Sequence, residues 1–410
     1  MITGIGIISP LGIGSSANWE SMTHGVSGIR QASFAGNDSF PHSNCGVVRN
    51  FNPQDYIENR KLLKLMNAES KIAVAAGRLA LEDAACNGNY SPERMGLYLG
   101  TGLTSGELQE LIPLIENSLD EHGNFSYSLL GTKALPNCNP LLSFKLLTNM
   151  PLCYVSIIFN IKGPNMIFCP WSGKTAEAVG EGMRAIQHDE IDCALVGGGD
   201  SKSNYIGFLS FSKLGLLSQL GACCPFDKRS DGIILSEGAT MLVLEDLEHA
   251  QKRSAHIYAE LAGYGIATEP CSASLFSTNP HILLKAMTNA LVDAHVSANE
   301  IDSLCASANS HPVGDRTEAQ AIESCFHETT VSVFAPKALT GDMVAAASPF
   351  TIAVTALALQ KGVIPPMINL DDKKEHIVFT KPHQREVRIA IANSFEMGNS
   401  KVSFVLKKCL

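Results

Sequence analysis

A long internal repeat constrains the fold of this chain more than any other feature of its sequence. The segment ALEDA (80–84) ends a helical pattern, and the strand-like MGLYLGTG (95–102) follows it. In the second half, ALVDA (290–294) ends a similar pattern and precedes DSLCASANS (302–310). Strands and helices that alternate in both copies predict an α/β protein of two similar βα halves, each a sheet covered by helices.

The first half of the repeat contains an additional segment. The segments AIQ (185–187) and ALQ (358–360) also correspond, but they are separated by fewer residues than ALEDA and ALVDA. The first half therefore contains an insertion between roughly 103 and 160. The insertion is apolar but broken by Pro136 and Pro140, so we expect either a cap over the core or an interface or channel wall. The candidate wall residues are Leu111, Leu114, Ile115, Leu129, Leu130, Leu146 and Met150.

Composition disfavours several classes of function. Hydrophobic residues make up 45% of the 410 residues and charged residues 17%, as in a globular protein with a large core. The net charge of −9 disfavours nucleic acid and anionic membranes, which attract concentrated basic surfaces. The N-terminus lacks the basic region of a signal peptide, and no uninterrupted apolar run reaches membrane-spanning length. We therefore expect a cytoplasmic protein.

The sequence predicts no metal and no cofactor. The 12 cysteines include no C-x-x-C pair and no zinc-ligand spacing, which fits a reducing compartment. Gly4-x-Gly6-x-x-Ser9 resembles a dinucleotide-binding loop, but it leads into Ser-Pro-Leu-Gly instead of a helix. No acidic residue follows it at the required distance, so we do not interpret it as a cofactor site.

The stretch NMIFCPWSGKTAEAVGEGMRAIQ (165–187) predicts a strand, a tight turn and a helix. Its second part has apolar residues at helical spacing, among them Ala176 and Val179. Enzymes often present a nucleophile in such a turn, because the first helical turn has free N–H groups and a positive dipole end. Two residues of the turn are candidates, Cys169 and Ser172.

Four stretches spread along the chain carry a family resemblance. They are TGIGIISPLG (3–12), NMPLCYVSIIFNIKGPN (149–165), PFDKRSDGIILSEGATMLVLEDLEHA (225–250) and NSFEMGNS (393–400). These stretches resemble motifs of the β-ketoacyl synthases, a thiolase-like family of condensing enzymes. The resemblance implies a duplicated fold of five layers, αβαβα, with an N-terminal half at 1–250 and a C-terminal half at 251–410.

The resemblance also implies a catalytic cysteine at the start of a buried helix, which takes an acyl chain from a carrier protein. Counted along the family motif, that position holds Ser172. Cys169 falls three residues early, on the strand side of the turn, and Pro170 follows it. At that place a thiol misses the field of the helix terminus that would lower its pKa.

Two histidines of the family are altered as well. The first should precede Pro312 of a P-x-x-D-x-T-E motif by five residues, and Ser307 stands there. The second should end a K-x-x-x-G-H motif that begins at Lys337, and Asp342 stands there. Lys337 and Glu318 are retained, either as leftover catalytic groups or, as we favour, as a buried ion pair that holds the loops.

Three altered catalytic positions on a complete scaffold resemble one subgroup, the chain-length factor or ketosynthase beta subunit of type II polyketide synthases. The resemblance implies a subunit that is inactive alone and pairs with a catalytic ketosynthase alpha subunit. It implies that the pair works on an acyl carrier protein bearing phosphopantetheine, and that this subunit shapes the tunnel that sets polyketide chain length. Many members have glutamine where this chain has Ser172.

Other interpretations stay open. A self-sufficient acyltransferase, condensing or hydrolytic enzyme would use Ser172 or Cys169 as nucleophile. In the hydrolytic version, a displaced loop brings in His311 as base, with Asp315 as its orienting group. Ser172 otherwise only makes a hydrogen bond at a helix start. Trp171, beside the nucleophile position, either plugs the acyl pocket or fills the core.

Overall fold

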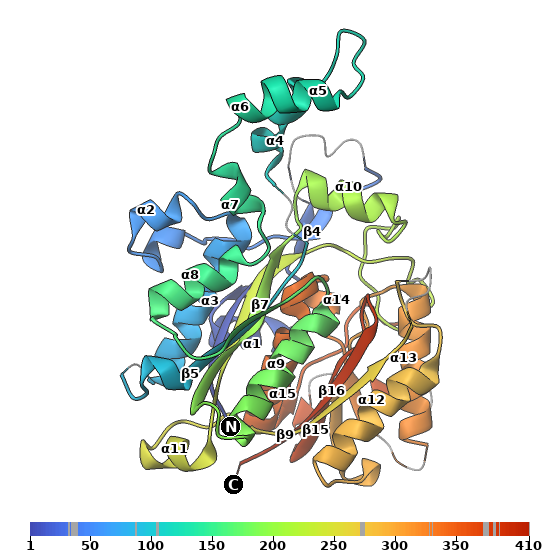
Figure 1. Cartoon of the computed structure of the whole chain (residues 1–410). Helices are drawn as coiled ribbons and strands as arrows, with labels where there is room; N and C mark the ends of the chain where they lie inside the picture. The colour runs from blue at the N-terminus through green and yellow to red at the C-terminus, as the bar shows by residue number, and fades with distance from the viewer. Residues whose placement is uncertain are drawn as a thin grey trace.

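The structure is a computed structural model with two six-stranded sheets (Figure 1). It describes residues 1–409 except 32, 34–39, 87, 104, 105, 271–274, 328, 330, 372–376, 380–382 and 385. The first sheet has the order β2 (Gly12–Ile13), β1 (Ile2–Ser9), β8 (Glu237–Glu245), β7 (Cys193–Ser201), β5 (Met95–Thr101), β6 (Asn165–Phe168). The second has the order β13 (Ile377–Phe379), β11 (Val331–Phe334), β10 (Ser303–Cys305), β15 (Ile389–Ser394), β16 (Ser400–Lys407), β9 (Glu260–Thr268).

The two sheets repeat one pattern of pairing. In the first, β5 pairs in parallel with β6 and β7, and β8 pairs antiparallel with β7 and β1. In the second, β10 pairs in parallel with β11 and β15, and β16 pairs antiparallel with β15 and β9. The predicted duplication of βα halves is therefore confirmed strand by strand.

Helices fill the other three layers. The outer face of the first sheet carries α3 (Ala68–Ala84), with α8 (Met150–Phe159) beside it, and that of the second carries α12 (Pro280–Asp293), against which α13 (Pro312–Cys325) packs. Between the sheets lie α9 (Ser172–Gln187) and α15 (Ala347–Lys361), which completes the expected αβαβα arrangement. The remaining elements are α1 (Ser15–Thr23), β3 (Ile29–Gln31), β4 (Asn44–Gly46), η2 (Pro53–Asp55), α2 (Arg60–Leu63), η3 (Pro92–Arg94), α10 (Tyr205–Lys213), α11 (Leu247–Lys252), η5 (Ala298–Glu300), α14 (Lys337–Thr340), η6 (Val344–Ala346), β12 (Val363–Ile364), β14 (His383–Gln384) and those of the insertion.

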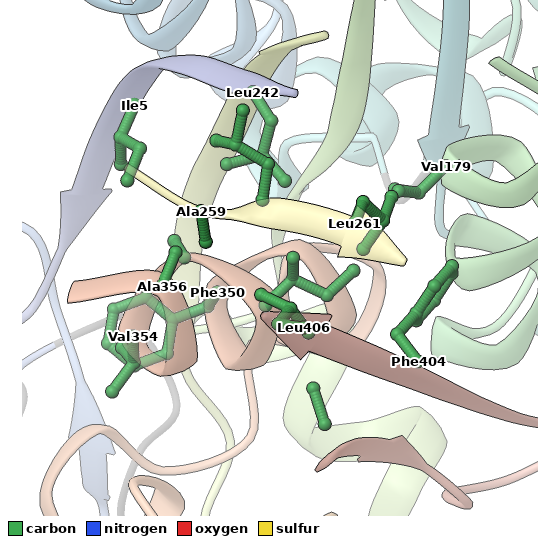
Figure 2. Packing of buried hydrophobic residues seen from close by; sticks show 14 of the residues in the cluster. Ile5, Val179, Leu242, Ala259, Leu261, Phe350, Val354, Ala356, Phe404 and Leu406 are labelled. Carbon is green, nitrogen blue, oxygen red and sulfur yellow. The ribbon is translucent and has the colours of Figure 1, made fainter. Parts of the chain in front are cut away.

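Within the central layer, α15 is apolar because sheets cover it on both sides. Every residue of α15 from Ala347 to Leu359 is buried. Figure 2 shows its side chains packed with residues of both sheets, among them Leu242 of β8 and Leu406 of β16. Within the described part of the chain, Val344–Lys361 is the one stretch long and apolar enough to cross a membrane, and its burial here marks it as core.

Most of the insertion projects from the body, whereas its last helix, α8, packs beside α3. It contains α4 (Leu108–Glu116), α5 (Tyr127–Leu129), η4 (Leu130–Ala134), α6 (Leu135–Asn137) and α7 (Leu142–Leu146). In Figure 1, α4, α5 and α6 extend away from both sheets, so the cap interpretation is wrong for this part. A hydrogen bond from Thr101 Oγ1 to the carbonyl oxygen of Thr148 (3.2 Å) joins its two ends. The Asn67 amide donates to the carbonyl oxygen of Lys145 (3.0 Å) and fastens this root to α3.

Each half brings one outer helix very close to one strand. A Cβ on Gly6 of β1 would lie 2.0 Å from the carbonyl oxygen of Ala76 in α3. A Cβ on Gly265 of β9 would lie 2.2 Å from the carbonyl oxygen of Ala286 in α12. Both strands therefore need glycine for helix packing. This is the structural role of the Gly4-x-Gly6 pair that resembled a dinucleotide-binding loop.

We predict that Gly6→Ala lowers the free energy of unfolding by about 1–3 kcal/mol, because its methyl group has no room beside α3. Gly131→Ala is the matched control, since no atom lies within 4 Å of a Cβ at that exposed position. It should leave the stability unchanged or slightly raised. Urea denaturation measures both, and equal stabilities of the two variants would contradict the close contact.

Candidate functional site

Ser172 opens the central helix α9, as the strand-turn-helix pattern predicts. Its side chain is buried, and its Oγ lies 2.5 Å from the Oγ of Ser348. Ser348 is the second residue of α15, so this contact joins the first turns of the two central helices. The first turn of α9, in the first half, thus faces the corresponding helix of the second half.

A chain of hydroxyl groups continues from this contact. Ser348 Oγ donates to the carbonyl oxygen of Ser172 (2.6 Å) or bonds Ser394 Oγ (2.6 Å). Ser394 Oγ donates to Oε2 of Glu396 (3.0 Å), at the end of β15. The Ser172 hydroxyl is therefore connected through two serines to a buried carboxylate.

Lys337 completes this chain. Its ammonium group forms an ion pair with Glu396 Oε1, and only 2% of either side chain is exposed. The ammonium also donates to the carbonyl oxygen of Ser307 (2.6 Å). Removing one partner of such a pair leaves a buried charge uncompensated, at a cost of about 3–5 kcal/mol.

The expected ion pair between Lys337 and Glu318 is therefore wrong, because Glu396 is the direct partner of Lys337. Glu318 Oε1 instead accepts hydrogen bonds from the Ser307 N–H (2.9 Å) and the Asn393 amide (3.1 Å). Burial raises the pKa of Glu318 to about 7. Glu318 thus holds the strand ends around the site.

Ser307 and Asp342, which stand where the family motifs predict histidines, hold main chain and loops in place. Ser307 Oγ accepts from the Phe395 N–H (2.8 Å). Asp342 accepts from the Asn309 amide (2.6 Å) and the Val344 N–H (2.8 Å), and burial raises the pKa of its carboxyl group. Neither residue offers an imidazole to shuttle a proton or stabilise an enolate.

Cys169 is half-buried on the strand side of the turn. Its Sγ donates to the carbonyl oxygen of Gly102 (3.6 Å). Burial raises the pKa of this thiol, and the nearby carboxylates of Glu69 and Asp200 raise it further. Its environment therefore favours the protonated thiol over the nucleophilic thiolate.

The structure separates His311 from the proposed Ser-His-Asp arrangement. The His311 ring stacks on Phe276 with centroids 3.8 Å apart, and its Nδ1 accepts from the Gly314 N–H (3.4 Å). Burial lowers the pKa of His311 to about 4. The Asp315 carboxylate, meant to orient it, accepts backbone N–H groups of Phe226, Asn309 and Ser310. Among the described residues, neither side chain has a hydrogen bond to Ser172.

Trp171 packs in the core and also lines a hollow. Its ring meets Phe211 edge-on, with centroids 6.4 Å apart. A Cβ on Gly398 would lie 2.7 Å from its Cδ1, so the ring presses on the loop after β15. It also borders a hollow of about 300 Å³, together with Lys174, Met397 and Gly398. Trp171 thus packs against the core and lines this hollow.

The candidate wall residues of the insertion lie in different environments. Leu111 and Leu146 meet at Gly106, where a Cβ would lie 3.1 and 2.9 Å from them. Met150 packs against the core of the first half. Ile115 is 48% exposed, and the others are half-buried: Leu114, Leu129 and Leu130.

Sequence reasoning missed Ser348, Ser394 and Glu396. Ser348 and Ser394 are single serines in apolar stretches, and no motif marked them. Glu396 could have been singled out from the sequence, because it is a charged residue inside NSFEMGNS, where the family loop is rich in glycine.

Solved structures match the fold over the whole chain. The ishigamide ketosynthase/chain length factor has a TM-score of 0.87 and 27% identity, and the match covers 100% of this chain and 98% of that one. A type II PKS acyl-carrier protein in complex with its ketosynthase bound to the hexaketide has a TM-score of 0.85 with 22% identity, again over 100% and 98%.

Sequence comparisons match as broadly. The 3-oxoacyl-[acyl-carrier-protein] synthase 2 of Coxiella burnetii is 30% identical over 100% of this chain and 98% of its own length. The enzyme of the same name from Vibrio harveyi is 28% identical over 100% and 98%. Residues 1–250 match the model of the beta-ketoacyl synthase N-terminal domain, and residues 258–371 match that of its C-terminal domain. The chain therefore belongs to the β-ketoacyl synthase family.

Proposed function

We propose that this chain is the chain-length factor, or ketosynthase beta subunit, of a cytoplasmic type II polyketide synthase. It pairs with a catalytic ketosynthase alpha subunit and shapes the tunnel in which malonyl units, delivered on an acyl carrier protein, extend the chain. The partner subunit supplies the cysteine and histidines of the reaction. The likeness to a ketosynthase/chain length factor supports this role.

The filled nucleophile position carries the proposal. Condensation needs a nucleophile that accepts the acyl chain and groups that stabilise an enolate. Here the five side chains that occupy the site bond one another in series: Ser172, Ser348, Ser394, Glu396 and Lys337. Relatives named as synthases suggest a condensing enzyme instead, but the Ser172 hydroxyl has no adjacent imidazole base among the described residues.

A free sheet edge and an apolar surface support the heterodimer. β6 ends the first sheet, and Met166 on it is 47% exposed. Ile157 of α8, which contacts β6, is 63% exposed. Sheet edges and apolar surfaces of this kind attract a second chain. The insertion adds further exposed apolar side chains: Ile112, Ile115, Phe125, Tyr127, Leu135, Leu141, Phe144 and Leu147.

We expect this chain to co-purify with a tagged ketosynthase that has an intact Cys-His-His set and is encoded beside its gene. Met166→Asp should abolish this capture, because it places a charge at the free sheet edge. The matched control is Val292→Asp, on the outer helix α12, which is 67% exposed and should leave capture unchanged. A stable homodimer that never captures a ketosynthase would contradict the proposal.

Leu129→Trp or Leu146→Trp should shorten the polyketide made by the heterodimer, because the larger ring takes volume from the tunnel. Mass spectrometry of the products measures the length. Leu220→Trp provides a control, since this side chain is 66% exposed in the loop before Cys223. If product length stays constant across the tunnel variants, the insertion does not measure the chain.

Ser172→Ala should leave the condensation rate of the heterodimer within about twofold, because the lost hydroxyl performs no chemistry. The chain alone should consume no malonyl-carrier substrate. A serine- or cysteine-directed acylating agent should not label this turn, which peptide mass spectrometry checks. Turnover by the chain alone, or labelling at Ser172 or Cys169, would favour the self-sufficient enzyme instead.

A further inference from the structure

The altered site is occupied by a carboxylate from the chain itself. Glu396 is 3% exposed, and its two oxygens face different partners. Oε1 pairs with the Lys337 ammonium group, and Oε2 accepts from the Ser394 hydroxyl (3.0 Å). The ammonium group compensates the charge of the buried carboxylate, and the hydroxyl donates a hydrogen bond to its other oxygen.

The loop that carries Glu396 is held in place independently. Lys401 is fully buried, and its ammonium group donates to three carbonyl oxygens of this loop. They belong to Phe395 (3.2 Å), Glu396 (2.6 Å) and Gly398 (2.9 Å). Ser307 also accepts from the Phe395 N–H (2.8 Å). The main chain of the loop is thus fixed by contacts that do not involve the Glu396 carboxylate.

Two other acids lie near Lys337 but are engaged elsewhere. Asp342 uses both oxygens, on the Asn309 amide and the Val344 N–H. Glu318 uses one oxygen for the Ser307 N–H and the Asn393 amide. Burial raises the pKa of both carboxyl groups, so both are easier to protonate than in water. The ion pair of Lys337 therefore depends mainly on Glu396.

We propose that this site is a carboxylate-binding site which the chain keeps closed with its own Glu396. The bound side chain excludes short carboxylates and thioesters that carry a free carboxylate. In a heterodimer this prevents the inactive half from capturing extender units meant for the partner, a consequence that rests on the proposed function. The occupancy itself belongs to the isolated chain and is tested there.

Glu396→Ala tests the occupancy, because it removes a methylene and a carboxylate that free acetate can replace. We expect this variant to unfold at a lower temperature than the wild type. Acetate should raise its midpoint saturably, by about 3 °C or more, whereas the neutral isostere acetamide should not. The wild-type midpoint should not respond specifically to acetate. If the variant folds poorly, refolding yield in acetate against acetamide gives the same comparison.

Three controls assign the effect to this site. Glu396→Gln keeps the volume filled, so acetate should not stabilise it. Glu396→Ala combined with Lys337→Met should lose the response, because the ammonium group is gone. Glu237→Ala removes a carboxylate held by the Ser201 hydroxyl and the Val48 N–H, with no ammonium partner among the residues that the structure describes, and should show no acetate effect.

A short malonyl thioester should stabilise Glu396→Ala and not the wild type. Equal stabilisation of both would overturn self-occupancy, because the native site would then be open. Equal effects of acetate and acetamide, or a Glu396→Ala variant as stable as the wild type, would also overturn it. The latter would mean that Asp342 had taken over Lys337. None of these results depends on a ketosynthase partner, so failure here is distinguishable from failure of the proposed function.

Discussion

Two helices packed between the two sheets, α9 and α15, determine where the candidate site lies. Because α15 is buried almost throughout and α9 buries most of its residues between the sheets, the two halves must close over them. Their first turns then meet, with Ser172 Oγ 2.5 Å from Ser348 Oγ. The site thus lies where equivalent helices of the two halves start side by side.

Much of the fold follows from local patterns. The repeat predicts α3 and α12, the strand-turn-helix pattern predicts β6 and α9, and the structure contains all four. Local signals suffice here because helical periodicity and close-packed glycines are properties of short segments. The assignment of Ser172, Ser307 and Asp342 to the altered catalytic positions stays a prediction from counting along the motifs, which needs no coordinates.

The contacts between the side chains of the site could not be predicted from the sequence. Lys337 pairs with Glu396, not with Glu318, and nothing in either segment specifies which buried acid takes the ammonium group. Ion pairs between distant segments depend on the final placement of β15 and α14, which no periodicity encodes. The cap interpretation of the insertion failed for a related reason. Short apolar helices have the same sequence pattern whether they cover their own core or project from it.

The insertion is attached to the layered body at a narrow root. Thr101 and Thr148 join its ends, and Asn67 ties that root to α3 through the backbone of Lys145. Both bonds end on backbone carbonyl oxygens of the insertion, which a residue of any type provides. Helices beyond the root are therefore free to change in length and sequence while the layered body stays as it is. Proteins with this architecture can therefore exchange the projecting helices of the insertion as a unit during evolution, without changes in the two sheets.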